Sequence, residues 1–155
     1  MYDAIYVALH QFGMPAAVES LRRRALVVFS DGDDTASLTS FESVLEAARR
    51  GAVATYTIRL MSPFDKIDAF GRSAFELREL ARDTGGRAFT SRGTDELSNA
   101  YEAVSGDLAH QYVLGFVQPS GTVSGVHRIG VVVNTGHIPL LHRAAYVAER
   151  PATGR

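Results

Sequence analysis

The sequence predicts an α/β protein with a doubly wound, Rossmann-like and mostly parallel sheet, followed by a C-terminal antiparallel β extension. Three observations support this fold class. Apolar runs of strand length alternate with helical patterns as far as Leu108, and strand-like runs then follow one another from Gln111 without intervening helices. With 155 residues, 46% of them hydrophobic, the chain is long enough for one domain with a substantial core.

The first two elements establish the alternation. Residues 2–12 place Ile5, Leu9 and Phe12 at nearly helical spacing, which predicts an amphipathic helix. Residues 25–30, "ALVVFS", form an apolar run of strand length. Such a run is typical of a strand that is buried on both faces of a parallel sheet.

The next helix and strand carry clear signals at their ends. Thr39 and Glu42 stand at the spacing of a capping box, and Gly51 supplies a stop. The helix between them has one apolar stripe. Residues 53–60, "VATYTIRL", are rich in β-branched and aromatic side chains and predict a second strand.

A second capping box, Ser73 with Glu76, predicts a helix that continues through Asp83 and ends at the glycine pair 85–86. The short run 87–90, "RAFT", is expected to be the third strand. These three strands should be mutually parallel, because each is followed by a helix that can cross back over the sheet.

The final helix is expected to begin at a Thr94 cap and to continue to Leu108. Three strand-like runs follow, at 111–119, 126–134 and 139–149, and they predict the antiparallel extension. The expected organisation is therefore an α/β domain over 1–109, a β extension over 110–149 and a loose tail over 150–155.

Composition excludes several functions. The net charge of -1 gives no electrostatic basis for binding nucleic acid or an anionic membrane. The absence of cysteine excludes thiol catalysis, disulfides and cysteine-ligated zinc. There is also no Gly-x-Ser-x-Gly elbow for a serine hydrolase. His127 and His142 lie in the extension without a third ligand, so we interpret them as half-buried surface residues rather than a metal pair.

The stretch "VVFSDGDDT" places Asp31, Asp33 and Asp34 directly after the first expected strand. Ligands of open parallel sheets bind beyond the carboxyl ends of the strands, and carboxylate oxygens suit Mg²⁺ or Ca²⁺. Asp31 is therefore a candidate metal ligand, although one aspartate does not make a site. For Asp33 and Asp34 we prefer a simpler interpretation, in which they start the next helix or face water.

An enzymatic alternative uses the same residues. Residues 31–35 match the Asp-x-Asp-x-Thr pattern of haloacid-dehalogenase-like phosphatases, in which Asp31 would attack phosphorus and Asp33 would be the general acid. This chemistry also needs a lysine and a second acidic pair for Mg²⁺. Lys66 is the sole lysine, and no such pair follows it. The phosphatase is therefore the weaker hypothesis.

Several segments together resemble the von Willebrand factor A family, most closely its bacterial VWFA-related domains. The resemblance extends from about Tyr2 to Tyr146. It depends on "ALVVFSDGDDTAS", "EAARRGA", "VATYTI", "ELARDTGGRAF" and "HQYVLGF" in this order. It implies a non-enzymatic, adhesion-type module that binds a protein ligand through a divalent cation, Mg²⁺ or else Mn²⁺ or Ca²⁺. In that family three loops hold the ion.

Only one of those three loops has a counterpart here. The aspartate that follows a later strand of the family corresponds to Asp31. The Asp-x-Ser-x-Ser loop is absent from the sequence, and the threonine of the remaining loop would precede Met1. The resemblance therefore implies the C-terminal part of such a domain, without its first strand and with an incomplete metal site. Loss of that strand predicts self-association through the exposed edge of 25–30. A metal-free structural or assembly fragment is a further alternative.

Overall fold

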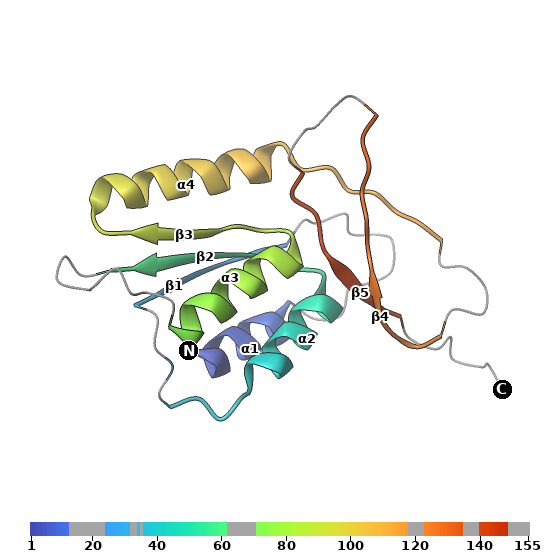
Figure 1. Cartoon of the computed structure of the whole chain (residues 1–155), viewed down its shortest axis with the longest axis horizontal. Helices are drawn as coiled ribbons and strands as arrows, with labels where there is room; N and C mark the ends of the chain where they lie inside the picture. The colour runs from blue at the N-terminus through green and yellow to red at the C-terminus, as the bar shows by residue number, and fades with distance from the viewer. Residues whose placement is uncertain are drawn as a thin grey trace.

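The computed structural model describes residues 1–12, 24–31, 34, 36–61, 71–117, 123–134 and 140–148. Figure 1 shows the arrangement of the helices and strands in this part of the chain. In chain order they are α1 (Tyr2–Gln11), β1 (Ala25–Ser30), α2 (Phe41–Gly51), β2 (Ala54–Leu60), α3 (Arg72–Thr84), β3 (Ala88–Ser91), α4 (Thr94–Ala109), β4 (Gly125–Arg128) and β5 (Ala145–Ala148).

A parallel sheet in the order β1-β2-β3 forms the centre of the fold. Ala25 of β1 pairs with Ala54 of β2, and Thr57 of β2 pairs with Ala88 of β3. The predicted parallel arrangement of these strands is therefore confirmed. All three carboxyl ends lie at the same edge of the sheet, and β1 and β3 are the outer strands.

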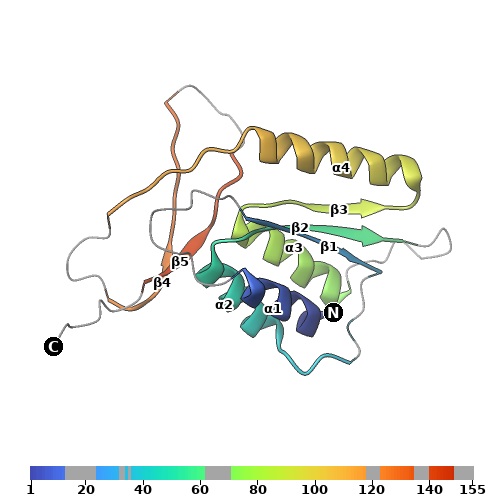
Figure 2. The same ribbon diagram turned by 180° about the vertical axis from the view of Figure 1, so that it is seen from behind.

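Helices cover both faces of this sheet (Figures 1 and 2). Alternate side chains of β1 enter two different hydrophobic clusters, because successive residues of a strand point to opposite faces. Val28 joins the cluster beneath α1, α2 and α3, whereas Val27 packs with Val104 of α4. The cluster on the three-helix side contains Ile5, Leu9, Val28, Phe41, Val44, Leu45, Ala48, Val53, Leu77 and Leu80.

The end of α3 is fixed closely against the middle of the sheet. Gly85 terminates the helix in the left-handed conformation, with φ of 84°. The Thr84 hydroxyl accepts a hydrogen bond of 2.9 Å from the N–H of Thr55 and donates to the carbonyl of Leu80. Gly86 then passes so close to β2 that a side-chain carbon added to it would lie 2.1 Å from the Thr55 carbonyl oxygen. The segment Thr84-Gly85-Gly86 therefore allows the end of α3 to pack closely against β2.

The caps of the helices differ from those predicted. Ser40, not Thr39, is the N-cap of α2, and its hydroxyl accepts the N–H of Ser43 at 3.2 Å. The N–H of Thr39 instead donates to the Asp3 carboxylate. Because Thr39 is bound to Asp3, which is distant in sequence, the N-cap of α2 lies one residue later than predicted. Local residue spacing does not reveal such a partner.

The other two predicted caps are also wrong. Gly71 precedes α3 and Gly93 precedes α4, and neither supplies a side-chain cap. Ser73 and Thr94 lie inside the helices. Glu76 has a different role, because it accepts hydrogen bonds from the Tyr2 hydroxyl and from Arg72.

The C-terminal extension contains an antiparallel pair, as predicted. Gly125 of β4 pairs with Ala148 of β5, and Arg128 pairs with Ala145. The expected strand over 111–119 is wrong for its described part, because residues 111–117 carry no strand. An extended apolar segment becomes a strand only by pairing, and its composition does not reveal whether a partner is present. The predicted tail over 150–155 lies outside the described residues.

The extension contacts the amino-terminal end of the parallel sheet, away from the carboxyl ends of β1, β2 and β3 (Figure 1). The N–H of Ala144 donates to the carbonyl of Asp83 at 2.9 Å, and the Arg143 guanidinium donates to the carbonyl of Arg49. Ala145 and Ala148 are buried. The antiparallel pair is thus joined to α2 and α3 by hydrogen bonds to their backbone and by packing.

Aromatic residues of the extension are less buried than the sequence suggests. For Tyr112 and Phe116, the strand-like composition of 111–119 favours core packing, but their exposed fractions are 89% and 63%. Phe116 contacts the ring of Tyr146 edge-on, with 5.3 Å between the centroids. Among the described helices, none combines the length and the apolar composition that crossing a bilayer requires.

Candidate functional site

Asp31 follows the last residue of β1 directly and is exposed at the carboxyl edge of the sheet. Val28, three residues earlier, is buried against the helices with an exposed fraction of 9%. This is the placement that the sequence predicts for a strand-end aspartate. A carboxylate here is accessible to a ligand or an ion that approaches the rim of the sheet.

Asp34 has a structural role that the sequence did not indicate. Its carboxylate accepts the N–H of Tyr2 at 2.8 Å, and also the N–H groups of Ala36 and Ser37. The Tyr2 hydrogen bond is the largest influence that holds the pKa of Asp34 far below its ordinary value, followed by the Ser37 hydroxyl. The first turn of α1 is therefore capped by a residue that is distant in sequence.

Asp3 makes the reciprocal connection. Its carboxylate accepts the N–H of Thr39 at 2.8 Å and that of Leu38 at 3.1 Å, while its own N–H donates to the Ser37 hydroxyl. Hydrogen bonds from Thr39, above all from its side chain, lower the pKa of Asp3. The loop after β1 and the amino end of α1 are thus joined in both directions. We call Asp3, Asp34 and Ser37 the loop clamp.

The loop clamp defines what surrounds Asp31. It holds the amino end of α1 beside the loop that begins at Asp31, at the carboxyl edge of the sheet. Asp34 is occupied by three N–H donors and has a structural role. Among the described residues, no three histidine or acidic side chains are grouped as metal ligands. Asp31 on its own therefore does not form a complete metal site.

The loop clamp should make stability depend on pH. The folded-state pKa of Asp34 is depressed, so its contribution is complete above the unfolded value of about 3.9 and is lost as the pH falls further. Replacing Asp34 with Asn should therefore lower the midpoint of urea unfolding at pH 7. The difference in this midpoint between the Asn variant and the wild-type chain should become steadily smaller below about pH 4. A difference that stays constant between pH 7 and pH 3 would show that the charge of Asp34 is not what matters.

The remaining residues of the sequence hypotheses are those of the phosphatase pattern and the two histidines. The phosphatase alternative requires Asp33 and Lys66, both of which lie outside the described residues. His127 stacks on Tyr146, with 5.4 Å between the ring centroids. The Nδ1 atom of His142 lies 2.8 Å from the carbonyl oxygen of Arg143. Both histidines thus have partners within the extension.

Comparison with known proteins does not assign a function to this chain. No family model and no curated protein matches the chain. The chain is similar to a solved structure described as an uncharacterized membrane spanning protein from Vibrio fischeri, with 23% identity and a TM-score of 0.47. The similarity covers 55% of this chain and 47% of that one, so it spans about half of that protein's length. Function must therefore be argued from the geometry of this chain.

Proposed function

We propose that the chain is part of a von Willebrand factor A-type module that binds a protein ligand without catalysis. In this proposal a divalent cation at Asp31 mediates the interaction, and a preceding segment supplies the remaining metal-binding groups. The observation that carries the proposal is the exposure of Asp31 at the carboxyl end of β1, three residues before Asp34, which binds the amino end of α1.

The sheet supports this proposal in two respects. Parallel strands in sequential order, with helices on both faces, are the arrangement expected for one half of a doubly wound sheet. In addition, β1 lies at an edge although its sequence is that of a strand buried between two neighbours. A further parallel strand beside β1 would complete the doubly wound, Rossmann-like fold that we propose for the intact domain.

The loop clamp gives the second line of support. In the family, a threonine loop comes just before the helix that corresponds to α1. The clamp holds the start of α1 against the loop that contains Asp31. A segment that enters α1 would therefore arrive beside Asp34, three residues after Asp31. This placement would allow a threonine and an aspartate from separate parts of the chain to share one ion.

A metal titration tests the proposal. We expect a protein extended upstream of Met1 to bind Mn²⁺, measured by loss of the free-ion signal in electron paramagnetic resonance. Asp31→Ala should weaken this binding by on the order of 100-fold, because it removes a direct carboxylate ligand. Asp95→Ala is the matched control, since it removes an exposed aspartate from the first turn of α4.

Two results would contradict the proposal. One is an upstream coding sequence without an Asp-x-Ser-x-Ser loop in the reading frame. The other is equal Mn²⁺ affinity in the Asp31 variant, the Asp95 variant and the wild-type protein. In either case a metal-free structural or assembly role would explain the chain better.

A further inference from the structure

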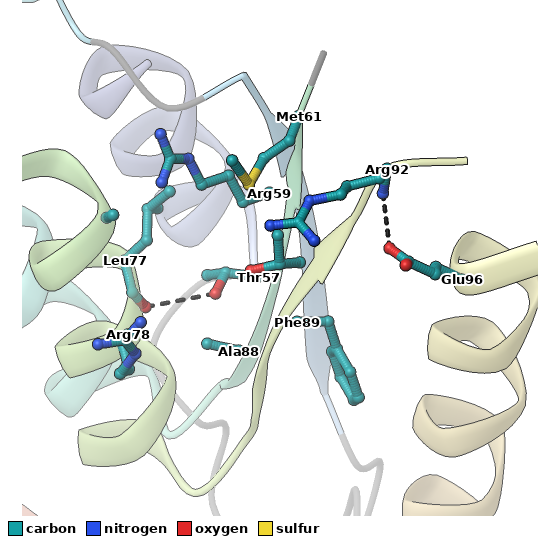
Figure 3. A pocket seen from close by; sticks show the side chains of 11 residues that line it. Thr57, Arg59, Met61, Leu77, Arg78, Ala88, Phe89, Arg92 and Glu96 are labelled. Carbon is teal, nitrogen blue, oxygen red and sulfur yellow. Dashed lines mark hydrogen bonds between the residues drawn. The ribbon is translucent and has the colours of Figure 1, made fainter. Parts of the chain in front are cut away.

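A cavity lies at the carboxyl ends of β2 and β3, against α3 (Figure 3). Its volume is about 380 Å³, which is within the range of small-molecule sites. The lining residues come from β2, β3, α3 and α4 and from the residues that directly follow β2 and β3. They include Thr57, Arg59, Leu77, Arg78, Arg92 and Glu96.

The charge of this lining is strongly unbalanced. Among the described lining residues, Arg59, Arg78 and Arg92 contribute three guanidinium groups, and Glu96 contributes the single carboxylate. Glu96 is engaged with the backbone, because it accepts the N–H of Arg92 at 2.7 Å. No ion pair between Arg78 or Arg92 and a carboxylate occurs within the described residues. The described part of the lining therefore carries more guanidinium groups than carboxylates.

The fold explains why these arginines line one cavity. Side chains alternate along β2, so Thr57 and Arg59 share the face that packs against α3. The Thr57 hydroxyl donates to the Leu77 carbonyl at 3.4 Å, which fixes this face against the helix. Arg78 is the next residue of α3. Figure 3 shows the side chain of Arg92 reaching from the end of β3 towards Thr57.

We propose that this cavity binds the phosphate group of a small molecule. Guanidinium groups match phosphate oxygens with paired, charge-assisted hydrogen bonds. A phosphate monoester carries a charge of about -1.5 to -2 at pH 7. It therefore suits the two guanidinium groups of Arg78 and Arg92 better than a single carboxylate does. Ala74 of α3 and Ala88 of β3 supply apolar surface for the remainder of the molecule. This inference is independent of any metal at Asp31.

A titration with inorganic phosphate tests this site in the full 155-residue chain. Binding should be followed by ¹⁵N nuclear magnetic resonance, at constant ionic strength, with citrate as the carboxylate comparison. We expect phosphate to shift the resonances around Arg59, Arg78 and Arg92, and to bind more tightly than citrate. Arg78→Gln and Arg92→Gln should each weaken binding roughly tenfold, the effect of one charge-assisted hydrogen-bonding partner.

Arg82→Gln is the matched control. Arg82 lies one turn beyond Arg78 on α3, is exposed and does not line this cavity. The substitution Arg82→Gln therefore removes the same charge from the same helix. The phosphate affinity should stay within about twofold of wild type, since distant exposed charges are largely screened. The proposal is overturned if phosphate does not bind at millimolar concentration, if citrate binds as tightly, or if the Arg82 variant loses as much affinity as the other two.

Discussion

Gly86→Ala should lower the free energy of unfolding by more than about 3 kcal/mol, a large share of the 5–15 kcal/mol typical of a domain. The added carbon would lie 2.1 Å from the carbonyl oxygen of Thr55 and 2.7 Å from its carbonyl carbon. Both atoms belong to the backbone of β2, the central strand, which pairs on both sides. Neither can move without separating β2 from α3 or from its neighbours.

Urea unfolding followed by circular dichroism measures this effect, with Gly106→Ala as the control. Gly106 lies within α4, where nothing comes within 4 Å of an added carbon. Because alanine favours helix over glycine by about 1 kcal/mol, this variant should be unchanged or slightly more stable. A Gly86 variant that unfolds within about 1 kcal/mol of wild type would show that α3 and β2 are not in such close contact.

The second large effect concerns β1. We expect the 155-residue chain to self-associate through this strand, because β1 pairs only with β2 in the described part of the chain. The carbonyl of Arg24 accepts a hydrogen bond from the N–H of Ala54, and backbone groups alternate in direction along a strand. The N–H groups of Val27 and Phe29 therefore point away from β2. Such an edge is a template for another strand, and the apolar sequence of β1 favours pairing.

A pair of substitutions at one position tests this mechanism. Phe29→Pro removes the outward N–H, whereas Phe29→Ala removes the same partly exposed ring but keeps the N–H. Sedimentation at micromolar concentrations should show association of the wild-type chain and the Ala variant, and weaker association of the Pro variant. A wild-type chain that remains a cooperatively unfolding monomer would contradict the expectation. An equal loss of self-association in both variants would show that the ring of Phe29, and not its N–H group, mediates the association.

The arrangement of the parallel strands was predictable because it depends on local patterns. Apolar runs at 25–30 and 53–60 alternate with amphipathic helices, and this order leaves few ways to pair the strands. The position of Asp31 at the strand end follows from the same pattern. The exact caps of α2, α3 and α4 were not predictable, because a distant partner such as Asp3 changes which N–H groups need a local cap.

Long-range contacts account for the remaining errors. Asp34 was assigned to the following helix or to solvent, whereas it caps α1 from the loop after β1. Residues 111–117 have the composition of a strand but no pairing partner among the described residues. The arginines that line the cavity at the ends of β2 and β3 come from separate parts of the chain, so no local motif in the sequence indicates the cavity.

The most direct test of the central proposal is a crystal structure of the protein extended upstream of Met1 and grown with Mn²⁺. Anomalous scattering locates this ion independently of any assumption about its ligands. We predict one additional strand, parallel to β1 on its outer edge, and an Mn²⁺ ion bound by a carboxylate oxygen of Asp31 at about 2.2 Å, as expected for a hard cation of this size. A structure in which the outer edge of β1 is covered by a different segment, with no manganese signal at Asp31, would contradict the proposal.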